Sequence, residues 1–219
     1  MARKSKMDAH LLVEGKNDLH VISALCKKHR VGQTFDIQPP KRNDLDSGGI
    51  DQLLKRFHFQ IRASDKQAIG IVLDADDNLL GHWQKVLDSI KKVRPHYVLP
   101  SQPDPTGTII AAPHDYEPRL GIWLMPDNQN LGTLEDFVAY LIPSEGQLRP
   151  YADEVLNKIE TANLNLYRHK RSKAFIHTWL AWQKEPGQPM GTAITAKALS
   201  AHSPIALTFV NWLNRLFNP

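Results

Sequence analysis

Short apolar runs suited to β-strands alternate with amphipathic stretches suited to helices in the first half of the chain. Apolar runs cover residues 11–13 and 68–73, residues 34–38 can form a further strand, and apolar positions at helical spacing cover 19–30, 50–61 and 79–93. The run at 68–73 is unbroken, which is typical of a strand covered on both faces. This succession of strand and helix predicts an α/β fold with a parallel, doubly wound sheet.

The second half of the chain is mainly helical after a proline-rich connection. Residues 95–118 predict many turns and one short strand at 108–112, and we expect the run at 119–125 to be the next strand, paired with it as a hairpin. Apolar spacing then predicts helices at 134–141, 148–162, 172–183 and 206–217. We expect the tail to be a helical extension that completes one structural unit.

The net charge, the cysteine content and the length of the apolar runs limit the classes of function that the chain can have. The 219 residues carry a formal net charge of +4, a mildly basic balance that allows nucleic-acid binding without requiring it. The single cysteine, Cys26, falls on the apolar stripe of the first helix and excludes an internal disulfide framework, which fits a reducing cytoplasm. No apolar run is long enough for a transmembrane helix, and the start is not typical of a signal peptide, so we expect a cytoplasmic protein without membrane association.

The stretch at 11–18 is the first to suggest chemistry. Glu14 ends an apolar run, Gly15 follows at once, and Asp18 falls in the first turn of the next helix. We expect the glycine to allow a sharp turn and to keep side-chain bulk away from the site. Two carboxylates at the end of a strand repel each other unless a cation or a shared proton compensates. The stretch therefore predicts a divalent metal at this end of the sheet.

Acidic residues also follow two later strands. Asp74 and Asp76 come directly after the run at 68–73, with Asp77 expected to cap the following helix. Glu135 comes after the strand at 119–125, in the first turn of a helix, where the helix dipole alone would favour an acid. Asp127 and Asp136 are weaker candidates in the same region.

Because ligands bind at the carboxyl ends of parallel strands, we expect these acids to meet at one edge of the sheet. Carboxylate oxygens suit Mg²⁺ or Mn²⁺, which would keep waters for a phosphate to displace. With two ions, one would activate a water and the other would stabilise the leaving oxygen.

A basic run lies further along the chain. Residues 167–173 (Tyr-Arg-His-Lys-Arg-Ser-Lys) could hold a phosphate backbone, with Tyr167 stacking on a base. We expect Lys170, Arg171 and Lys173 to be the nucleic-acid contacts. A solvated helix end explains the same pattern equally well.

The acidic motifs resemble those of the Toprim fold. Residues 13–18 (Val-Glu-Gly-Lys-Asn-Asp) and 71–76 (Ile-Val-Leu-Asp-Ala-Asp) match its glutamate after the first strand and its Asp-x-Asp after a later one. Toprim domains occur in topoisomerases, bacterial primases, a small maturation ribonuclease for ribosomal RNA, recombination proteins and the overcoming-lysogenization-defect (OLD) nucleases. Residues 121–128, 132–137 and 177–183 resemble more narrowly the DUF3226 group of small bacterial Toprim-like proteins.

The resemblance implies a Toprim-like catalytic domain at 1–142, with a helical extension at 143–219, and metal-dependent phosphoryl transfer on nucleic acid. By the resemblance, Glu14, Asp74 and Asp76 are catalytic. Asp18 and Glu135 match acids that help hold the metals. OLD-like members also use a lysine after the acidic motifs, for which Lys173 is the first candidate and Lys170 the second.

The leading hypothesis is therefore a Mg²⁺-dependent nuclease, and two alternatives stay open. One is a receiver-like module in which an aspartate becomes phosphorylated. The other is a non-catalytic metal- or nucleic-acid-binding regulatory subunit of a separate ATPase chain, the kind of partner that OLD-type domains use. The choice between DNA and RNA and the oligomeric state do not follow from the sequence.

Overall fold

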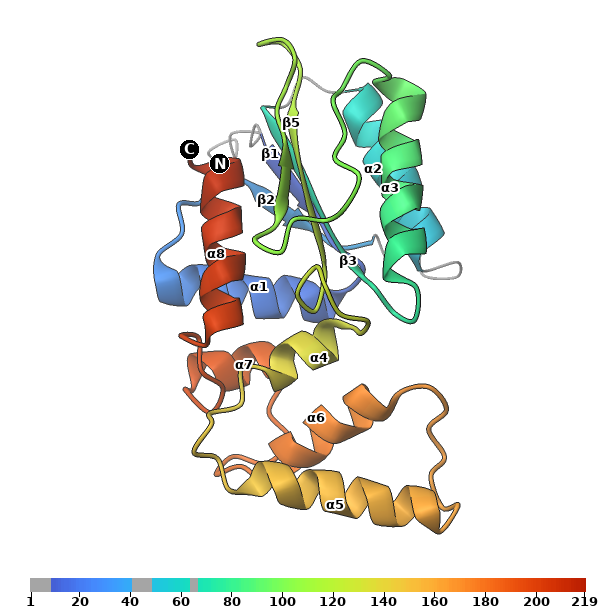
Figure 1. Cartoon of the computed structure of the whole chain (residues 1–219). Helices are drawn as coiled ribbons and strands as arrows, with labels where there is room; N and C mark the ends of the chain where they lie inside the picture. Colours follow the sequence, from blue (N-terminus) through green and yellow to red (C-terminus); the bar gives the residue numbers. More distant parts are fainter. Residues whose placement is uncertain (1–8, 41–48, 64–66) are drawn as a thin grey trace.

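The computed structural model describes residues 9–40, 49–63 and 67–219. Within these residues five strands form one sheet in the order β2-β1-β3-β5-β4 (Figure 1). The strands are β1 (Ala9–Leu12), β2 (Asp36–Gln38), β3 (Ala68–Asp74), β4 (Thr108–Ile110) and β5 (Arg119–Met125). The first four in spatial order are parallel, and β4 pairs antiparallel with β5 at one edge. The predicted α/β fold with a mostly parallel sheet is confirmed.

Helices cover both faces of the sheet, as Figure 1 shows. One face carries α1 (Lys16–His29) and α8 (Pro204–Phe217), and the other carries α2 (Ile50–Arg62) and α3 (Leu79–Val93). The central strand β3 is buried along almost its whole length because both of its faces are covered. The last helix of the chain is therefore part of the sheet's own packing.

Helix α8 approaches two neighbouring strands where each has a glycine. A side-chain carbon at Gly121 would overlap Leu216 of α8, and one at Gly70 would lie only 3.0 Å from the same side chain. Glycine within a strand marks such close approaches, since any larger residue would push the helix away from the sheet. These two positions set how closely the C-terminal helix packs.

Four further helices lie beyond the carboxyl end of the parallel strands (Figure 1). They are α4 (Leu134–Ala139), α5 (Leu148–Thr161), α6 (Arg171–Ala181) and α7 (Met190–Thr195). Helices α5 and α6 contact each other, α6 contacts α4, and α7 contacts α1. Helix α7, which has six residues, was not predicted from the sequence.

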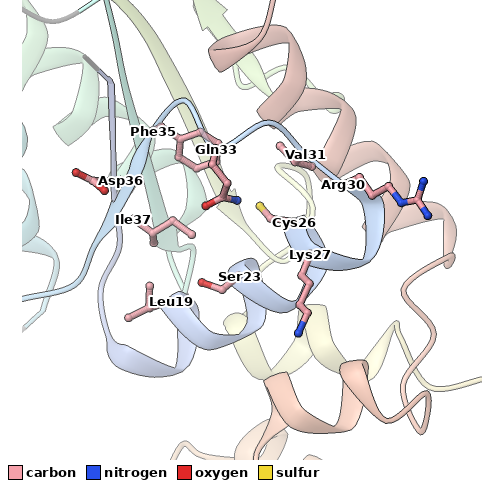
Figure 2. A pocket seen from close by; sticks show the side chains of 10 residues that line it. All are labelled: Leu19, Ser23, Cys26, Lys27, Arg30, Val31, Gln33, Phe35, Asp36 and Ile37. Carbon is pink, nitrogen blue, oxygen red and sulfur yellow. The ribbon is translucent and has the colours of Figure 1, made fainter. Parts of the chain in front are cut away.

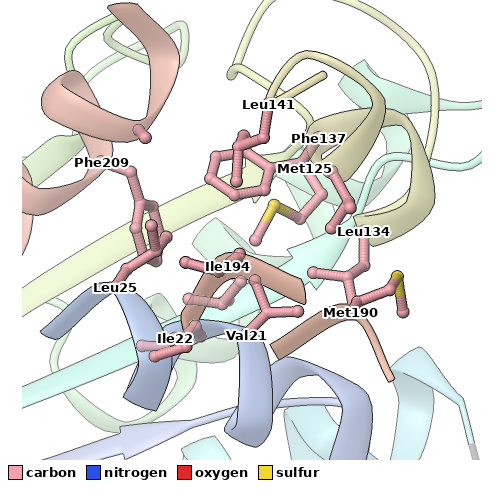
Figure 3. Close-up of a cluster of buried hydrophobic side chains, with 14 of the residues drawn as sticks. Val21, Ile22, Leu25, Met125, Leu134, Phe137, Leu141, Met190, Ile194 and Phe209 are labelled. Atoms are coloured by element: carbon pink, nitrogen blue, oxygen red, sulfur yellow. The ribbon is translucent and has the colours of Figure 1, made fainter. Parts of the chain in front are cut away.

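One apolar cluster joins these helices to the sheet. Figure 3 shows Val21 of α1, Phe137 of α4, Ile194 of α7 and Phe209 of α8 meeting near Met125 at the end of β5. The cluster fixes the position of α4 relative to the strand ends. Because α4 carries Glu135, this packing decides where that carboxylate lies.

None of the described helices is long and apolar enough to cross a membrane.

Candidate metal centre

Four acidic side chains gather at the carboxyl ends of the neighbouring parallel strands β1 and β3. Glu14 follows β1, Asp18 lies in the first turn of α1, Asp74 ends β3, and Glu135 lies in the first turn of α4. All four line one cavity of about 320 Å³, which we call the acidic cavity. The structure thus brings together four of the five residues that the sequence predicts as metal ligands.

Two hydrogen bonds fix the geometry of the acidic cavity. The backbone N–H of Asp74 donates to Glu14 Oε1 at 2.8 Å, and the backbone N–H of Leu134 donates to Asp74 Oδ1 at 2.9 Å. The loop after β1 is thereby tied to β3, and β3 is tied to the start of α4. The second oxygen of each of these two carboxyl groups forms no hydrogen bond with the residues that the structure describes. It remains available to a ligand in the cavity.

Burial and mutual repulsion disfavour ionisation of these groups. Burial raises the pKa of Asp74 to about 9, and the carboxylates of Glu14, Asp18, Glu135 and Asp76 add to the rise. Burial likewise raises the pKa of Asp18 to about 7, with further contributions from Glu14 and Glu135. Burial also raises the pKa of Glu14, although the hydrogen bond from the Asp74 N–H opposes that shift. At neutral pH the cluster therefore holds protons that a cation would displace.

The donor set fits a hard divalent cation held partly by water. In the described part of the chain, no three His, Cys, Asp or Glu side chains are already placed so that they could hold one ion together. Mg²⁺ is usually bound by one or two carboxylates, with waters and substrate oxygens completing an octahedron, so a closed protein cage is not required. The free oxygens of Glu14 and Asp74 would serve such an ion, and Asp18 and Glu135 line the same cavity.

Asp76 does not line the acidic cavity, in contrast to the prediction that it is a metal ligand alongside Asp74. It is exposed, with a left-handed φ of 48°, and its backbone exchanges hydrogen bonds of 2.8 and 2.9 Å with Gly132. This bridge turns Asp76 toward a neighbouring cavity of about 660 Å³, which we call the second cavity. Its charge still reaches the acidic cavity, because it raises the pKa of both Glu14 and Asp74.

Two of the three weaker acidic candidates have local structural roles. Asn78, not Asp77, caps α3, since its side-chain oxygen accepts from the Gly81 N–H at 3.0 Å. The Asp127 carboxylate accepts hydrogen bonds within its own turn, from the backbone N–H groups of residues 129 and 130. Asp136 accepts from the backbone and the hydroxyl of Thr133 as part of the capping box of α4. None of these three acids lines the acidic cavity.

The predicted cations have three different environments. Lys173 of α6 points its ammonium toward the site, with Nζ 4.0 Å from Glu135 Oε1. Lys170 is exposed at the start of α6. Arg171 is held by α5 instead, since its guanidinium contacts Asp153 and Glu160 at 3.3 Å each. Of these three predicted cations, Lys173 is the one that lies beside an acid of the acidic cavity, which Lys16 also lines.

Two residues near the acids were not found by sequence reasoning. His82 of α3 is buried, and its Nδ1 lies 3.0 Å from the carbonyl oxygen of Asp74. Ser172 of α6 donates its hydroxyl to Asp136 Oδ1 at 2.5 Å. The sequence signal for His82 is a histidine on the apolar face of a helix. No sequence signal marks Ser172, because its partner is 36 residues away.

Gly15 has a simpler role than the one predicted. Its φ of −152° and ψ of −178° are extended backbone that any residue adopts, so the turn does not require glycine. A side-chain carbon there would lie 3.4 Å from Asp18 Oδ2, an ordinary contact. The glycine therefore only keeps the mouth of the acidic cavity clear.

A larger cavity lies between α1 and β2 (Figure 2). It measures about 620 Å³, and its lining combines apolar side chains with Lys27, Arg30 and Asp36. Cys26 also lines it, but burial raises the pKa of the thiol to about 12, which excludes a thiolate nucleophile at neutral pH. This cavity has no cluster of catalytic groups, so the acidic cavity is the better candidate despite its smaller volume.

Residues 8–218 match the family described as "Protein of unknown function (DUF3226)". Neither the curated proteins nor the solved structures compared with the chain match it. The match covers the sheet, the acidic cavity and the C-terminal helices together. The family description assigns no activity, so a function has to be argued from the site.

Proposed function

Because the chain belongs to the DUF3226 family, whose description names no activity, we propose a function from the acidic cavity itself: a Mg²⁺-dependent nuclease of the Toprim type. One observation carries the proposal. Glu14, Asp18, Asp74 and Glu135 come from three separate segments, yet they converge on one cavity at the ends of neighbouring parallel strands. Structural stability alone gives no reason to bring four carboxylates together, and the raised pKa values of Glu14, Asp18 and Asp74 are typical of functional sites.

The order of the acids along the fold supports the Toprim assignment. The glutamate follows the first strand, the Asp-x-Asp segment follows β3, and these two strands are parallel neighbours in the sheet. The hydrogen bond between Glu14 and the Asp74 N–H joins the two motifs directly. Two of the three acids that the resemblance names as catalytic, Glu14 and Asp74, therefore meet at the acidic cavity, whereas Asp76 lines the second cavity.

Each residue of the site has a role in phosphodiester hydrolysis. Glu14 and Asp74 would hold the cation through their free oxygens, and Asp18 and Glu135 would orient its waters. Bound there, Mg²⁺ or Mn²⁺ supplies Lewis-acid stabilisation of phosphate oxygens and lowers the pKa of a coordinated water. Lys173 lies beside Glu135, where its ammonium would stabilise negative charge that develops on the phosphate.

The chemistry of the site favours a polyanionic substrate. A cation with only partial protein ligation has positions for phosphate oxygens, which hard cations prefer. The start of α6 adds two exposed cations, Lys170 and Lys173, and the ammonium of Lys173 lies 4.0 Å from Glu135. A small negative centre with basic residues beside it is what binding of a nucleic-acid backbone to a metal site requires.

A cleavage assay tests the proposal. Labelled DNA and RNA are incubated with the protein and Mg²⁺ or Mn²⁺, and Glu14→Gln and Asp74→Asn are compared with the wild type. We expect metal-dependent cleavage that each substitution lowers by at least about a hundredfold, since each removes a group that acts in the transition state. Asp127→Asn is the matched control, because this carboxylate follows a strand but lies outside the acidic cavity.

Cleavage that persists in both Glu14→Gln and Asp74→Asn would overturn the nuclease proposal. Metal binding without cleavage would instead favour the regulatory-subunit alternative. That alternative predicts activity only after a partner ATPase is added.

A further inference from the structure

We propose that the second cavity binds one unpaired nucleotide base next to the metal centre, so that the substrate is single-stranded nucleic acid. The inference rests on the proposed function and deepens it by naming the substrate class. The residues that carry it are Asp76, Asp77, Leu131 and His169, all of which line the second cavity. None of them belongs to the acidic cavity.

The two cavities are neighbours on either side of one short segment. Leu134 and Glu135 line the acidic cavity, and Gly132, Thr133 and Asp136 line the second cavity. A polymer with a phosphate at the acidic cavity could therefore place a neighbouring unit at the second cavity. A base and a phosphate of one strand could occupy the two places together.

Both walls of the second cavity are held in place. On one side, Asp76 is fixed by its two backbone hydrogen bonds with Gly132. On the other side, the hydroxyl of Ser172 donates to Asp136 at 2.5 Å, and Arg171 is anchored to α5. A preformed cavity reduces the entropy cost of ordering a bound ligand.

The lining groups suit a base better than a phosphate. Asp76 and Asp77 would repel a bare phosphate, but carboxylates accept hydrogen bonds from the exocyclic amino groups of bases. His169 supplies an imidazole, one of the rings on which unpaired bases stack. Leu131 has 58% of its surface exposed and offers an apolar face to the same ligand.

The backbone at His169 supports a specific role. His169 has a left-handed φ of 54°, a conformation that costs energy for most residues with a side chain. His169 precedes Lys170, the N-cap residue of α6, and lines the second cavity. Such strained positions tend to occur at ligand sites, where the surrounding structure maintains them.

A base in a duplex could not enter this cavity. Its faces are covered by stacking and its amino edge is paired, so it must first be unstacked and unpaired. The volume of about 660 Å³ suits a small ligand and not a double helix. The geometry therefore selects a strand whose bases are already free.

Fluorescence anisotropy tests the inference with a labelled single strand, as DNA or as RNA, and a duplex of the same sequence. Binding is measured in Ca²⁺, and a gel confirms that the probe stays intact. We expect the single strand to bind at least about tenfold more tightly than the duplex, because one stacked base contributes that much. The DNA and RNA arms show which sugar is preferred.

Two substitutions and one control locate the base. His169→Asn removes the imidazole ring, and asparagine tolerates the left-handed backbone at that position. Leu131→Ser removes the apolar side chain, and residue 131 does not have a left-handed backbone. We expect each to weaken single-strand binding by roughly five- to tenfold. His177→Asn is the control, since His177 is exposed on α6, the helix that follows His169, but does not line the cavity.

Three results would overturn the inference: duplex binding as tight as single-strand binding, no binding of either probe, or unchanged affinity in both His169→Asn and Leu131→Ser. Failure of the nuclease proposal is recognised separately. It appears as absent or metal-independent cleavage in the wild type, whatever the binding assay shows.

Discussion

Asp18→Asn is predicted to make the metal-free protein more stable near neutral pH, although it removes a candidate metal ligand. Asp18 is only 6% exposed and lies beside Glu14 and Glu135, and its pKa is raised from an ordinary value of 3.8 to about 7. Because the folded state binds this proton more tightly than the unfolded state, the stability of the wild type falls as pH rises from about 4 to about 7. Asparagine cannot ionise, so the variant avoids that loss.

The size of the stability difference between Asp18→Asn and the wild type follows from the pKa shift of Asp18. A difference of one pKa unit corresponds to about 1.36 kcal/mol, so a rise from 3.8 to about 7 sets an upper limit of about 4 kcal/mol at pH values above 7. The asparagine amide also has to be buried, which reduces the gain. We expect a net stabilisation of roughly 2 to 4 kcal/mol, or roughly 5 to 15 °C in Tm for a chain of this length.

Thermal unfolding in EDTA at about pH 4.5 and about pH 8 measures the effect. The variant should match the wild type at the lower pH and exceed it at the higher pH, whereas Asp127→Asn should behave as the wild type at both. With Mn²⁺ at about a hundred times its Kd, the wild type should gain about 2.7 kcal/mol and Asp18→Asn clearly less. A variant that is less stable than the wild type at the higher pH, or a difference that does not change with pH, would refute the electrostatic reasoning.

Three further outcomes follow from the packing and the charges. Lys173→Ala should lower kcat for cleavage by about ten- to a hundredfold with little change in unfolding temperature, and Lys173→Arg should restore part of the loss in the same assay. Ser172→Ala should lower the free energy of unfolding by about 1 to 2 kcal/mol in urea titrations, because the carboxylate that it contacts on α4 loses a donor. Gly121→Ala should cost about 1 to 3 kcal/mol in the same titrations because the new methyl group overlaps Leu216, whereas Gly15→Ala, which meets only an ordinary contact, should stay within about 0.5 kcal/mol.

The strands that form the centre of the sheet could be predicted because their burial leaves a direct trace in the sequence. The unbroken apolar run of β3 and that of β5 reflect helices on both faces of the sheet. The meeting of Glu14 with Asp74 could also be predicted, since the ends of parallel strands share one edge.

The displacement of Asp76 could not be predicted from local pattern. It depends on a backbone bridge to Gly132, which is distant in sequence and has no side chain to signal the contact.

The position of α6 over the site also depends on contacts between residues that are distant in sequence. The Ser172–Asp136 hydrogen bond and the anchoring of Arg171 by α5 are both long-range contacts. Sequence periodicity predicts that α6 exists but not where it packs.

The most direct test of the central claim is anomalous diffraction from a crystal of the wild-type protein soaked in Mn²⁺. The acidic cavity should show an anomalous peak between the carboxylates of Glu14 and Asp74, with the remaining coordination completed by water, and the peak should be lost in Glu14→Gln. An empty acidic cavity, or Mn²⁺ bound only elsewhere on the molecule, would contradict the account.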